Sequence, residues 1–67
     1  VALGNWGDPM AVPALVHALH DAEPLIRGHV AWALGRIHSE TAHRELEQAL
    51  FSETDEWVRQ ELQHALS

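Results

Sequence analysis

The amino-acid sequence predicts an all-α fold, a short α-solenoid of two antiparallel helix pairs that follow the end of a preceding helix. Three observations support this prediction: an internal repeat, helical spacing of the apolar residues in each repeat, and turn residues between the apolar stretches. Ala2-Leu3-Gly4 recurs 31 residues later as Ala33-Leu34-Gly35, and after a further 32 residues as Ala65-Leu66-Ser67. A repeat of this length cannot bury its apolar stripe alone, so successive repeats are expected to stack.

The repeat divides the chain into three parts. Residues 1–7 are expected to be the end of a preceding repeat, with Trp6 as a core residue just past a helix end. Residues 8–37 form repeat 1, and residues 38–67 form repeat 2. Because the chain starts with Val1 in the middle of the repeated motif, we expect it to be a piece of a longer protein.

Repeat 1 carries the signals of two helices. Asp8 is a candidate N-cap, and Pro9 suits the first helical position, where a missing N–H costs nothing. Residues 21–24 form a turn whose proline opens the second helix. Gly35 is small at a place where two helices could approach closely. The expected apolar stripes are Val12, Leu15, Val16 and Leu19 on the first helix, and Ile26, Val30, Leu34 and Ile37 on the second.

Repeat 2 follows the same plan with a more acidic composition. Ser52 and Asp55 fit a capping box before its second helix, where Asp55 and Glu56 also suit the positive end of the helix dipole. From residue 39 onward, seven acidic residues accompany two arginines. Because a terminal repeat needs a polar outer face, repeat 2 is expected to be a C-terminal cap. The expected stripes are Ala42, Leu46, Ala49 and Leu50, then Val58, Leu62, Ala65 and Leu66.

The composition argues against several classes of function. The chain contains no cysteine, so it has no disulfide, no thiolate metal site and no thiol nucleophile. It has ten acidic residues and four basic ones, for a net charge of −6, which gives autonomous nucleic-acid binding little support. No apolar run approaches the roughly 18 residues of a membrane span, and no signal peptide is recognisable. We therefore expect no membrane partner.

The polar residues give no catalytic, cofactor-binding or metal site. His17 and His20 lie at i, i+3 and could share a cation, but the end of their helix is expected to be solvated. The spacing Glu-x-x-His occurs at 40–43 and 61–64, yet both segments lie off the apolar stripes, and a di-iron site needs two further inward glutamates. No serine lies in a Gly-x-Ser-x-Gly turn, and no glycine-rich loop follows a strand. A metal-dependent enzyme is therefore the least supported class.

One basic and aromatic group has two interpretations. Arg27, with Arg59 at the equivalent position of repeat 2, is expected to donate hydrogen bonds to loop carbonyls or to acids such as Asp8 and Asp21. Trp32 lies roughly opposite the stripe of its helix and is expected to pack on the helices of the next repeat. Otherwise, four residues would form an exposed patch suited to RNA or to another partner: Arg27, His29, Trp32 and Arg36.

Several motifs resemble the short HEAT repeats first noted in phycobilin lyases. These motifs are Asp-Pro-x-Ala-Val-Pro-x-Leu at 8–15, Ala-Leu at 18–19, Pro-Leu-Ile-Arg at 24–27 and Ala-Trp-Ala-Leu-Gly at 31–35. A narrower match is similar to the C-terminal HEAT-like segment of bacterial epoxyqueuosine reductases; it consists of ALGNWGD at 2–8 and EPLIRGHVAWALGRI at 23–37. The resemblance implies a HEAT-like α-solenoid but leaves the function of this segment open.

The resemblance also implies what the parent protein does. In that family, a cobalamin-binding domain and two 4Fe–4S clusters reduce the epoxide on an anticodon-loop base of tRNA, the last step of queuosine biosynthesis. The resemblance implies a cytoplasmic enzyme whose catalytic acid, cobalamin site and cluster-binding cysteines all lie upstream of the segment matched here. No cofactor is therefore expected in this chain itself.

Two hypotheses about function follow. The first is a non-catalytic scaffold module at the C-terminal end of a tRNA-modifying reductase, which braces the catalytic core or helps to position tRNA. The second is a generic protein-interaction module, as in a bilin-lyase-like subunit, that binds another polypeptide. The first hypothesis predicts a strongly apolar N-terminal end and weak RNA binding, and the second predicts a polypeptide partner and no dependence on RNA. From the repeat itself, we expect the N-terminal end to expose apolar surface that meets the rest of the parent polypeptide or self-associates.

Overall fold

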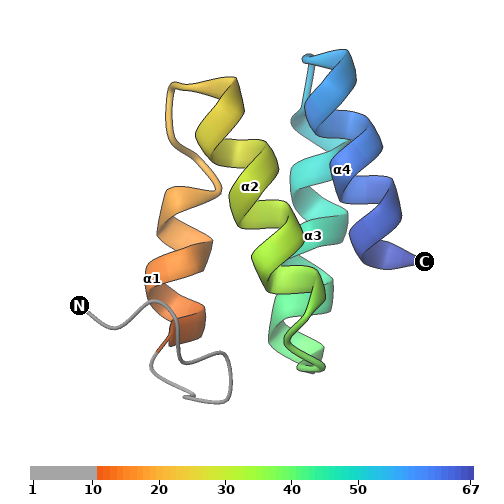
Figure 1. Ribbon diagram of the computed structural model, residues 1–67. Coiled ribbons are helices and arrows are strands. Elements are labelled where there is room, and N and C mark those ends of the chain that lie inside the picture. Colours follow the sequence, from red (N-terminus) through yellow and green to blue (C-terminus); the bar gives the residue numbers. More distant parts are fainter. Residues whose placement is uncertain (1–10) are drawn as a thin grey trace.

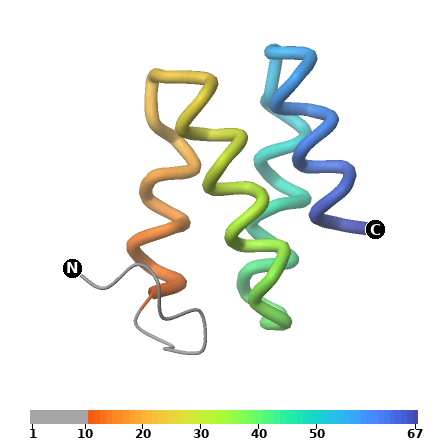
Figure 2. The backbone as a smooth tube through the Cα atoms, viewed as in Figure 1, coloured from red at the N-terminus to blue at the C-terminus, as the bar shows by residue number. Residues whose placement is uncertain are grey.

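The computed structural model describes residues 11–67, which form two antiparallel pairs of α-helices. Figure 1 shows the pairs side by side, with the α1–α2 and α3–α4 loops at one end and the α2–α3 turn at the other. The backbone trace in Figure 2 passes through the helices in this order, and residues 11–67 contain no strand. The all-α prediction is confirmed for this part of the chain. The helices are α1 (Ala11–Ala18), α2 (Pro24–Gly35), α3 (Glu40–Ser52) and α4 (Glu56–Leu66).

The sequence signals explain where the second and third helices start. α2 starts at Pro24, as predicted, because proline has no N–H group that an intrahelical bond would have to satisfy. Its N-cap residue, Glu23, makes no side-chain cap. α3 is capped by Ser39, whose hydroxyl oxygen accepts a hydrogen bond from the Ala42 N–H at 3.3 Å. The expectations for Val1–Leu3, Trp6, Asp8 and Pro9 lie outside the described residues.

The capping box predicted at the start of α4 is wrong in one member. Asp55 is the N-cap, and its Oδ1 accepts a hydrogen bond from the Val58 N–H at 3.0 Å. Ser52, however, is the last residue of α3, and its hydroxyl donates to the Ala49 carbonyl at 3.4 Å. Because α3 continues to Ser52 before the loop begins, Asp55 is the residue left at the cap. Asp55 and Glu56 lie at the N-terminus of α4, as predicted from the helix dipole.

The core lies between the helix pairs and is built from the predicted stripes. The side chains that bury the most volume come from three different helices, so the core ties the two repeats together. Each such leucine or valine contributes about 1.5–3 kcal/mol by leaving water. The buried members of the predicted stripes are Leu15, Leu19, Val30, Leu34, Ala42, Leu46, Ala49, Val58 and Leu62.

One stripe residue departs from the prediction. Ile26 is 42% exposed, although Val58, its equivalent in repeat 2, is completely buried. A difference in neighbours accounts for this. Val58 belongs to the common core, and its helix α4 packs mainly on α2 of the preceding repeat, whereas among residues 11–67 no helix precedes repeat 1 to pack on α2 in the same way. Helical periodicity identifies the apolar side of a helix, but burial depends on what stacks against it.

The most extensive contact between helices joins α2 to α4, and it depends on two glycines of α2. The ring of Trp57 lies directly over Gly28, in the space where a Cβ atom would be. At the other end of the contact, a Cβ on Gly35 would lie 2.8 Å from the Ala65 Cβ and 2.9 Å from its Cα. The close approach predicted at Gly35 is therefore present, and it positions the surface described next.

Candidate interaction surface

Arg27 links the two repeats through the α3–α4 loop. Its Nε and Nη2 donate to the two carboxylate oxygens of Glu53, both at 2.8 Å, which is the paired geometry that suits a guanidinium and a carboxylate. Its Nη1 donates to the carbonyl oxygens of Asp21 at 2.9 Å and Ala22 at 3.1 Å. The side chains of Arg27 and Glu53 are only 18% and 6% exposed. The Arg27 guanidinium therefore binds the two loops between helices and is mostly buried. Arg27 is not part of the exposed patch that the sequence suggested.

Each member of this ion pair shifts the pKa of the other. The hydrogen bonds from Arg27 lower the pKa of Glu53 below its ordinary value of 4.5, against the opposing effect of burial. A further hydrogen bond from the Asp55 N–H to Glu53 Oε2, at 3.0 Å, acts in the same direction. Reciprocally, the Glu53 carboxylate raises the pKa of Arg27. Both shifts favour the ionised forms of the pair.

Arg59 reproduces part of this arrangement in repeat 2. Its Nη1 donates to the carbonyl oxygens of Leu50 at 2.9 Å and Glu53 at 3.1 Å. The predicted bonding to loop carbonyls is confirmed for Arg27, whereas Arg59 bonds to one carbonyl in the last turn of α3 and to one just after it. The acid that pairs with Arg27 is Glu53, which the sequence did not lead us to expect. A usable signal was present, because Glu53 stands two residues before the N-cap Asp55, at the start of a turn.

The other three residues of the predicted patch share the exposed side of α2. Trp32 is 51% exposed, and the guanidinium carbon of Arg36 lies 5.1 Å from the centre of its ring. This distance lies within the range of a cation–π interaction. His29 is exposed one helical turn before Trp32, and Leu25 is 62% exposed one turn earlier still.

α4 adds a second set of residues to the same side of the molecule. The rings of His29 and Trp57 meet edge to face, with centres 6.0 Å apart and planes inclined at 68°. Trp32 and Arg36 share a shallow hollow with Glu61 and His64 of α4. We call this surface the α2–α4 face; it comprises Leu25, His29, Trp32, Arg36, Trp57, Glu61 and His64.

Trp57 is the member of this face that the sequence analysis did not single out. It is 39% exposed, and its ring covers Gly28. The signal was the repeat itself: position 57 corresponds to Leu25, and the glycine at 28 provides the space for its ring. Trp57 therefore packs on the neighbouring repeat in the way that was predicted for Trp32, while about half of the Trp32 surface stays exposed.

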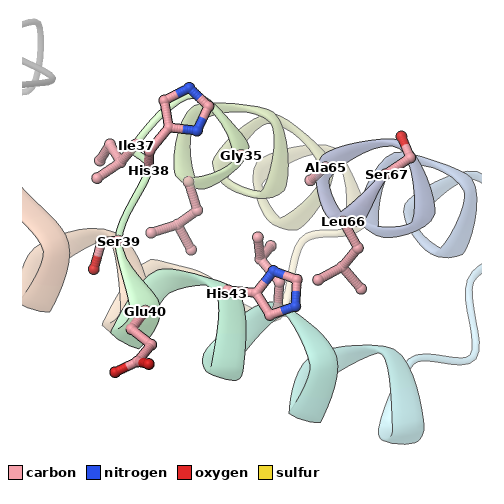
Figure 3. Close-up of a pocket in the computed structure, with 11 residues that line it drawn as sticks. Gly35, Ile37, His38, Ser39, Glu40, His43, Ala65, Leu66 and Ser67 are labelled. Atoms are coloured by element: carbon pink, nitrogen blue, oxygen red, sulfur yellow. The ribbon is translucent and has the colours of Figure 1, made fainter.

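The histidine and glutamate residues that were considered as metal ligands do not form a metal site in the described part of the chain. Between residues 11 and 67, no group of three potential ligands is close enough to hold an ion. Figure 3 shows His43 of α3 and Leu66 of α4 pointing into a hollow beside the α2–α3 turn, with Glu40 on its rim. The His43 imidazole lies 3.6 Å from Glu47 on its own helix, and both side chains are more than half exposed. This hollow offers mixed polar and apolar contacts but no ligand set.

Comparison with known proteins identifies the repeat. Residues 1–67, the whole chain, match a family described as HEAT repeats. This chain belongs to the HEAT-repeat family. The α-solenoid predicted from the 31-residue period is thus a HEAT-like array. No solved structure matches the chain.

The curated relatives of this HEAT-repeat chain include several epoxyqueuosine reductases. It is 39% identical over 67 residues to the epoxyqueuosine reductase of Bacillus subtilis, covering 98% of this chain and 17% of the enzyme. It is 41% identical over 63 residues to the Listeria monocytogenes enzyme, covering 92% of this chain and 17% of that enzyme. An uncharacterised protein in the gldA 3′ region of Geobacillus stearothermophilus is 44% identical over 63 residues, which are 92% of this chain and 29% of that protein. The chain therefore spans less than a third of each of these relatives.

The residues of this chain bear on two of the expectations, a 4Fe–4S cluster and a membrane-spanning helix. Iron–sulfur clusters are held mainly by cysteine thiolates, and this HEAT-repeat chain has no cysteine, so its residues do not fit a 4Fe–4S cluster. Among the helices of residues 11–67, none combines the length and the hydropathy that a membrane span requires.

Proposed function

We propose that this HEAT-repeat chain is a non-catalytic module of an epoxyqueuosine reductase that helps to hold the tRNA substrate through its α2–α4 face. The identity of 34–41% to four epoxyqueuosine reductases supports the parent activity. The cobalamin and the 4Fe–4S clusters implied by the resemblance would then belong to other parts of that protein. The module would brace the catalytic core and contribute contacts outside the reaction centre.

The observation that carries the proposal is that Trp32, with Arg36 over its ring, and Trp57 share the α2–α4 face. Single-stranded RNA loops are recognised by aromatic rings and guanidinium planes that stack on unpaired bases. Trp32 is 51% exposed and carries Arg36 over its ring, and Trp57 lies nearby on α4 with 39% of its surface exposed. Two tryptophans on neighbouring helices, one with a guanidinium against it, give such a loop a platform.

The charge distribution limits the strength of this contact. Arg36 is the one arginine of the α2–α4 face, and Glu61 lies on the same face. The number of cations that contact phosphates determines how steeply RNA affinity falls with salt. We therefore expect weak binding with a shallow salt dependence, which suits a module that assists a larger enzyme.

A labelled anticodon stem-loop, titrated against the chain, tests the proposal. Trp32→Ala removes one stacking platform and should weaken binding roughly 5- to 100-fold, since stacking on an aromatic ring contributes about 1–3 kcal/mol per base. Arg36→Gln should weaken it less and should also flatten the salt dependence. Phe51→Ala is the matched control, because Phe51 is 93% exposed but lines a different groove, between α3 and α4. Equal effects of Trp32→Ala and Phe51→Ala would contradict the proposal.

The net charge of −6 and the exposed Leu25 favour a second candidate, a module that binds another polypeptide. The same variants separate the two. If the stem-loop does not bind at low salt, while Trp32→Ala abolishes copurification of a defined protein partner, the polypeptide hypothesis replaces the RNA hypothesis.

A further inference from the structure

Arg59 repeats the position of Arg27 but only part of its hydrogen bonding. In both arginines, Nη1 donates to two carbonyl oxygens at the end of the preceding helix or in the loop that follows it. Nε and Nη2 of Arg27 also hold the Glu53 carboxylate, both at 2.8 Å. The same two atoms of Arg59 donate to no group of residues 11–67, and no carboxylate of this range forms an ion pair with Arg59. Arg59 is therefore oriented by its carbonyl contacts and still has two donors for an anion.

Arg59 borders a groove between α3 and α4. The groove has a volume of about 610 Å³, within the roughly 300–1,000 Å³ of small-ligand sites, and its lining comes from α3 and α4 alone. The apolar part of the lining is Leu50, Phe51 and Leu66; Phe51 is 93% exposed, and the two leucines are partly buried. We call this surface the α3–α4 groove; it comprises Arg44, Glu47, Gln48, Leu50, Phe51, Arg59 and Leu66.

The α3–α4 groove differs in charge from the rest of repeat 2. From residue 39 onward, seven acidic residues and two arginines give a net charge of −5. Both of these arginines line the groove, and one of the seven acids, Glu47, lines it with them, so the lining has a net charge of +1. The groove is therefore the part of an acidic repeat that is complementary to an anionic group beside an apolar one.

The two arginines lie at different levels along the groove. Arg59 Nη1 bonds to the Leu50 carbonyl, which fixes the level of Arg59 near the end of α3. Arg44 precedes Leu50 by six residues on the same helix, so a rise of about 1.5 Å per residue separates their backbones by about 9 Å. A polyproline II segment rises about 3.1 Å per residue with three residues per turn, so its residues i and i+3 share one side about 9 Å apart. Two acidic residues with two apolar residues between them match this spacing.

We propose that the α3–α4 groove binds an acidic peptide segment of another polypeptide. A carboxylate of the segment pairs with Nε and Nη2 of Arg59, and an apolar side chain packs on Phe51 and Leu66. The Arg27–Glu53 pair is the model for the first contact, because it shows what the same two atoms hold in repeat 1. A second acid, three positions away in the segment, pairs with Arg44. This groove shares no residue with the α2–α4 face, so the proposal does not depend on RNA binding.

Three other occupants fit the α3–α4 groove less well. RNA is a polyanion, and repeat 2 as a whole has a charge of −5, whereas a short peptide brings only one or two charges. A second copy of the chain brings a net charge of −6. A stacked helix would meet Gln60 at the position where α2 offers Gly28 to Trp57, so it could not approach as closely as α4 approaches α2.

A synthetic peptide, Gly-Glu-Leu-Leu-Glu-Gly with both ends blocked, tests the proposal when it is titrated against the 67-residue chain labelled with ¹⁵N. We expect shifts of the Leu50, Phe51 and Leu66 amide signals that saturate with peptide concentration. The control peptide has glutamine in place of both glutamates, which keeps the size and removes the charges. It should bind roughly 10- to 100-fold more weakly, because hydrogen bonds between charged groups are lost.

Substitutions in the chain locate the two contacts. Arg59→Gln should weaken the glutamate peptide roughly 10- to 100-fold and should change the glutamine peptide by less than about 2-fold. Phe51→Ala should weaken both peptides about 3- to 10-fold, and since Phe51 is 93% exposed, its loss does not disturb the core. Arg44→Gln, at an exposed position, should have a smaller effect of about 2- to 5-fold. Arg36→Gln is the matched control, because it removes the same charge from the α2–α4 face.

This experiment and the RNA titration can fail independently, because Phe51→Ala and Arg36→Gln exchange roles between them. Equal affinities of the two peptides, or equal effects of Arg59→Gln and Arg36→Gln, would overturn the proposal. Absence of amide shifts in the groove at millimolar peptide would also overturn it. Shifts of the Phe51 amide caused by the anticodon stem-loop in place of the peptide would make RNA the occupant. Shifts that depend on the concentration of the chain alone would make a second copy the occupant, and either result replaces the peptide.

Discussion

The two repeats share one sequence plan, but their equivalent residues have different surroundings. Leu34 of α2 is completely buried, whereas Leu66, 32 residues later in α4, is only partly buried. Conversely, Val58 of α4 is completely buried and the equivalent Ile26 of α2 is 42% exposed. Each helix buries the side that meets the other repeat. Burial in this chain is therefore decided by the neighbouring repeat as much as by the apolar pattern of the helix itself.

The comparison extends to the residues that set the spacing between helices. α2 has Gly28 and Gly35 where Trp57 and Ala65 of α4 approach, and repeat 2 has Gln60 and the C-cap residue Ser67 at the equivalent positions. A helix needs small residues at the points where a neighbouring helix packs closely on it, because larger side chains at those points would hold the two backbones apart. The side of a repeat that the next repeat packs on therefore carries small residues, and the side that packs on the previous repeat carries larger ones.

The largest expected effect comes from truncating Leu34 and its equivalent in repeat 2, Leu66, which differ in burial. Leu34→Ala should destabilise the chain by about 2–5 kcal/mol, because it removes a fully buried side chain and leaves a cavity between the repeats. Leu66→Ala, the matched variant in repeat 2, should cost about 1 kcal/mol or less, since it exchanges a partly buried side chain. Urea unfolding followed by far-UV circular dichroism measures both. Equal losses would mean that the two positions are equally buried in solution.

The next effect separates the two equivalent arginines. Arg27→Gln should cost about 1.5–3 kcal/mol, because it breaks both charged hydrogen bonds to Glu53 while that carboxylate stays 6% exposed. Arg59→Gln should cost less, since Arg59 donates hydrogen bonds to two carbonyl oxygens. Chemical denaturation at neutral pH measures the difference. If Arg59→Gln were the more costly change, the link between repeats would have been assigned to the wrong arginine.

These two comparisons show what could be predicted from the sequence. The 31-residue period predicted the stripes, and Leu34 and Leu62 are buried as that period requires. The equivalence of Arg27 and Arg59 predicted their bonds to loop carbonyls. Such features repeat with the sequence, so one chain contains enough information to find them.

The missed features depend on contacts between repeats. Glu53 pairs with a residue 26 positions away, and Trp57 fills a space over Gly28, so neither role follows from the spacing within one helix. Ile26 has a pattern that predicts burial but lacks a covering helix among residues 11–67. Ser52 was misplaced at a cap because the end of α3 depends on how far that helix packs, which local signals determine poorly.

The contribution of the Arg27–Glu53 ion pair to stability should depend on pH, because Glu53 becomes protonated in acid. The folded state lowers the pKa of Glu53 below 4.5, so its contribution to stability is fully present above about pH 4.5 and is lost as the pH falls through the lower folded value. The stability difference between the native chain and Glu53→Gln, about 1–2 kcal/mol at neutral pH, should therefore be smaller at an acidic pH well below 4.5. Denaturant unfolding at both pH values measures it. Glu47→Gln is the control, because Glu47 is 58% exposed and should give little difference at either pH. A Glu53→Gln difference that persists in acid would assign the loss to packing.

The smallest expected effect tests the spacing between α2 and α4. A methyl group on Gly35 would lie 2.8 Å from the Ala65 Cβ and 2.9 Å from its Cα, and backbone cannot yield as a flexible side chain can. Crowding of this kind costs about 1–3 kcal/mol, while alanine in place of a helical glycine returns up to about 1 kcal/mol. Gly35→Ala should therefore destabilise the chain by about 1 kcal/mol net. Ser67→Ala removes an exposed hydrogen bond from the serine hydroxyl to the His64 carbonyl and should change stability by less than about 0.5 kcal/mol. Thermal unfolding of the two variants gives the comparison directly, and a Gly35→Ala chain more stable than the parent would show that the helices lie farther apart than their contact requires.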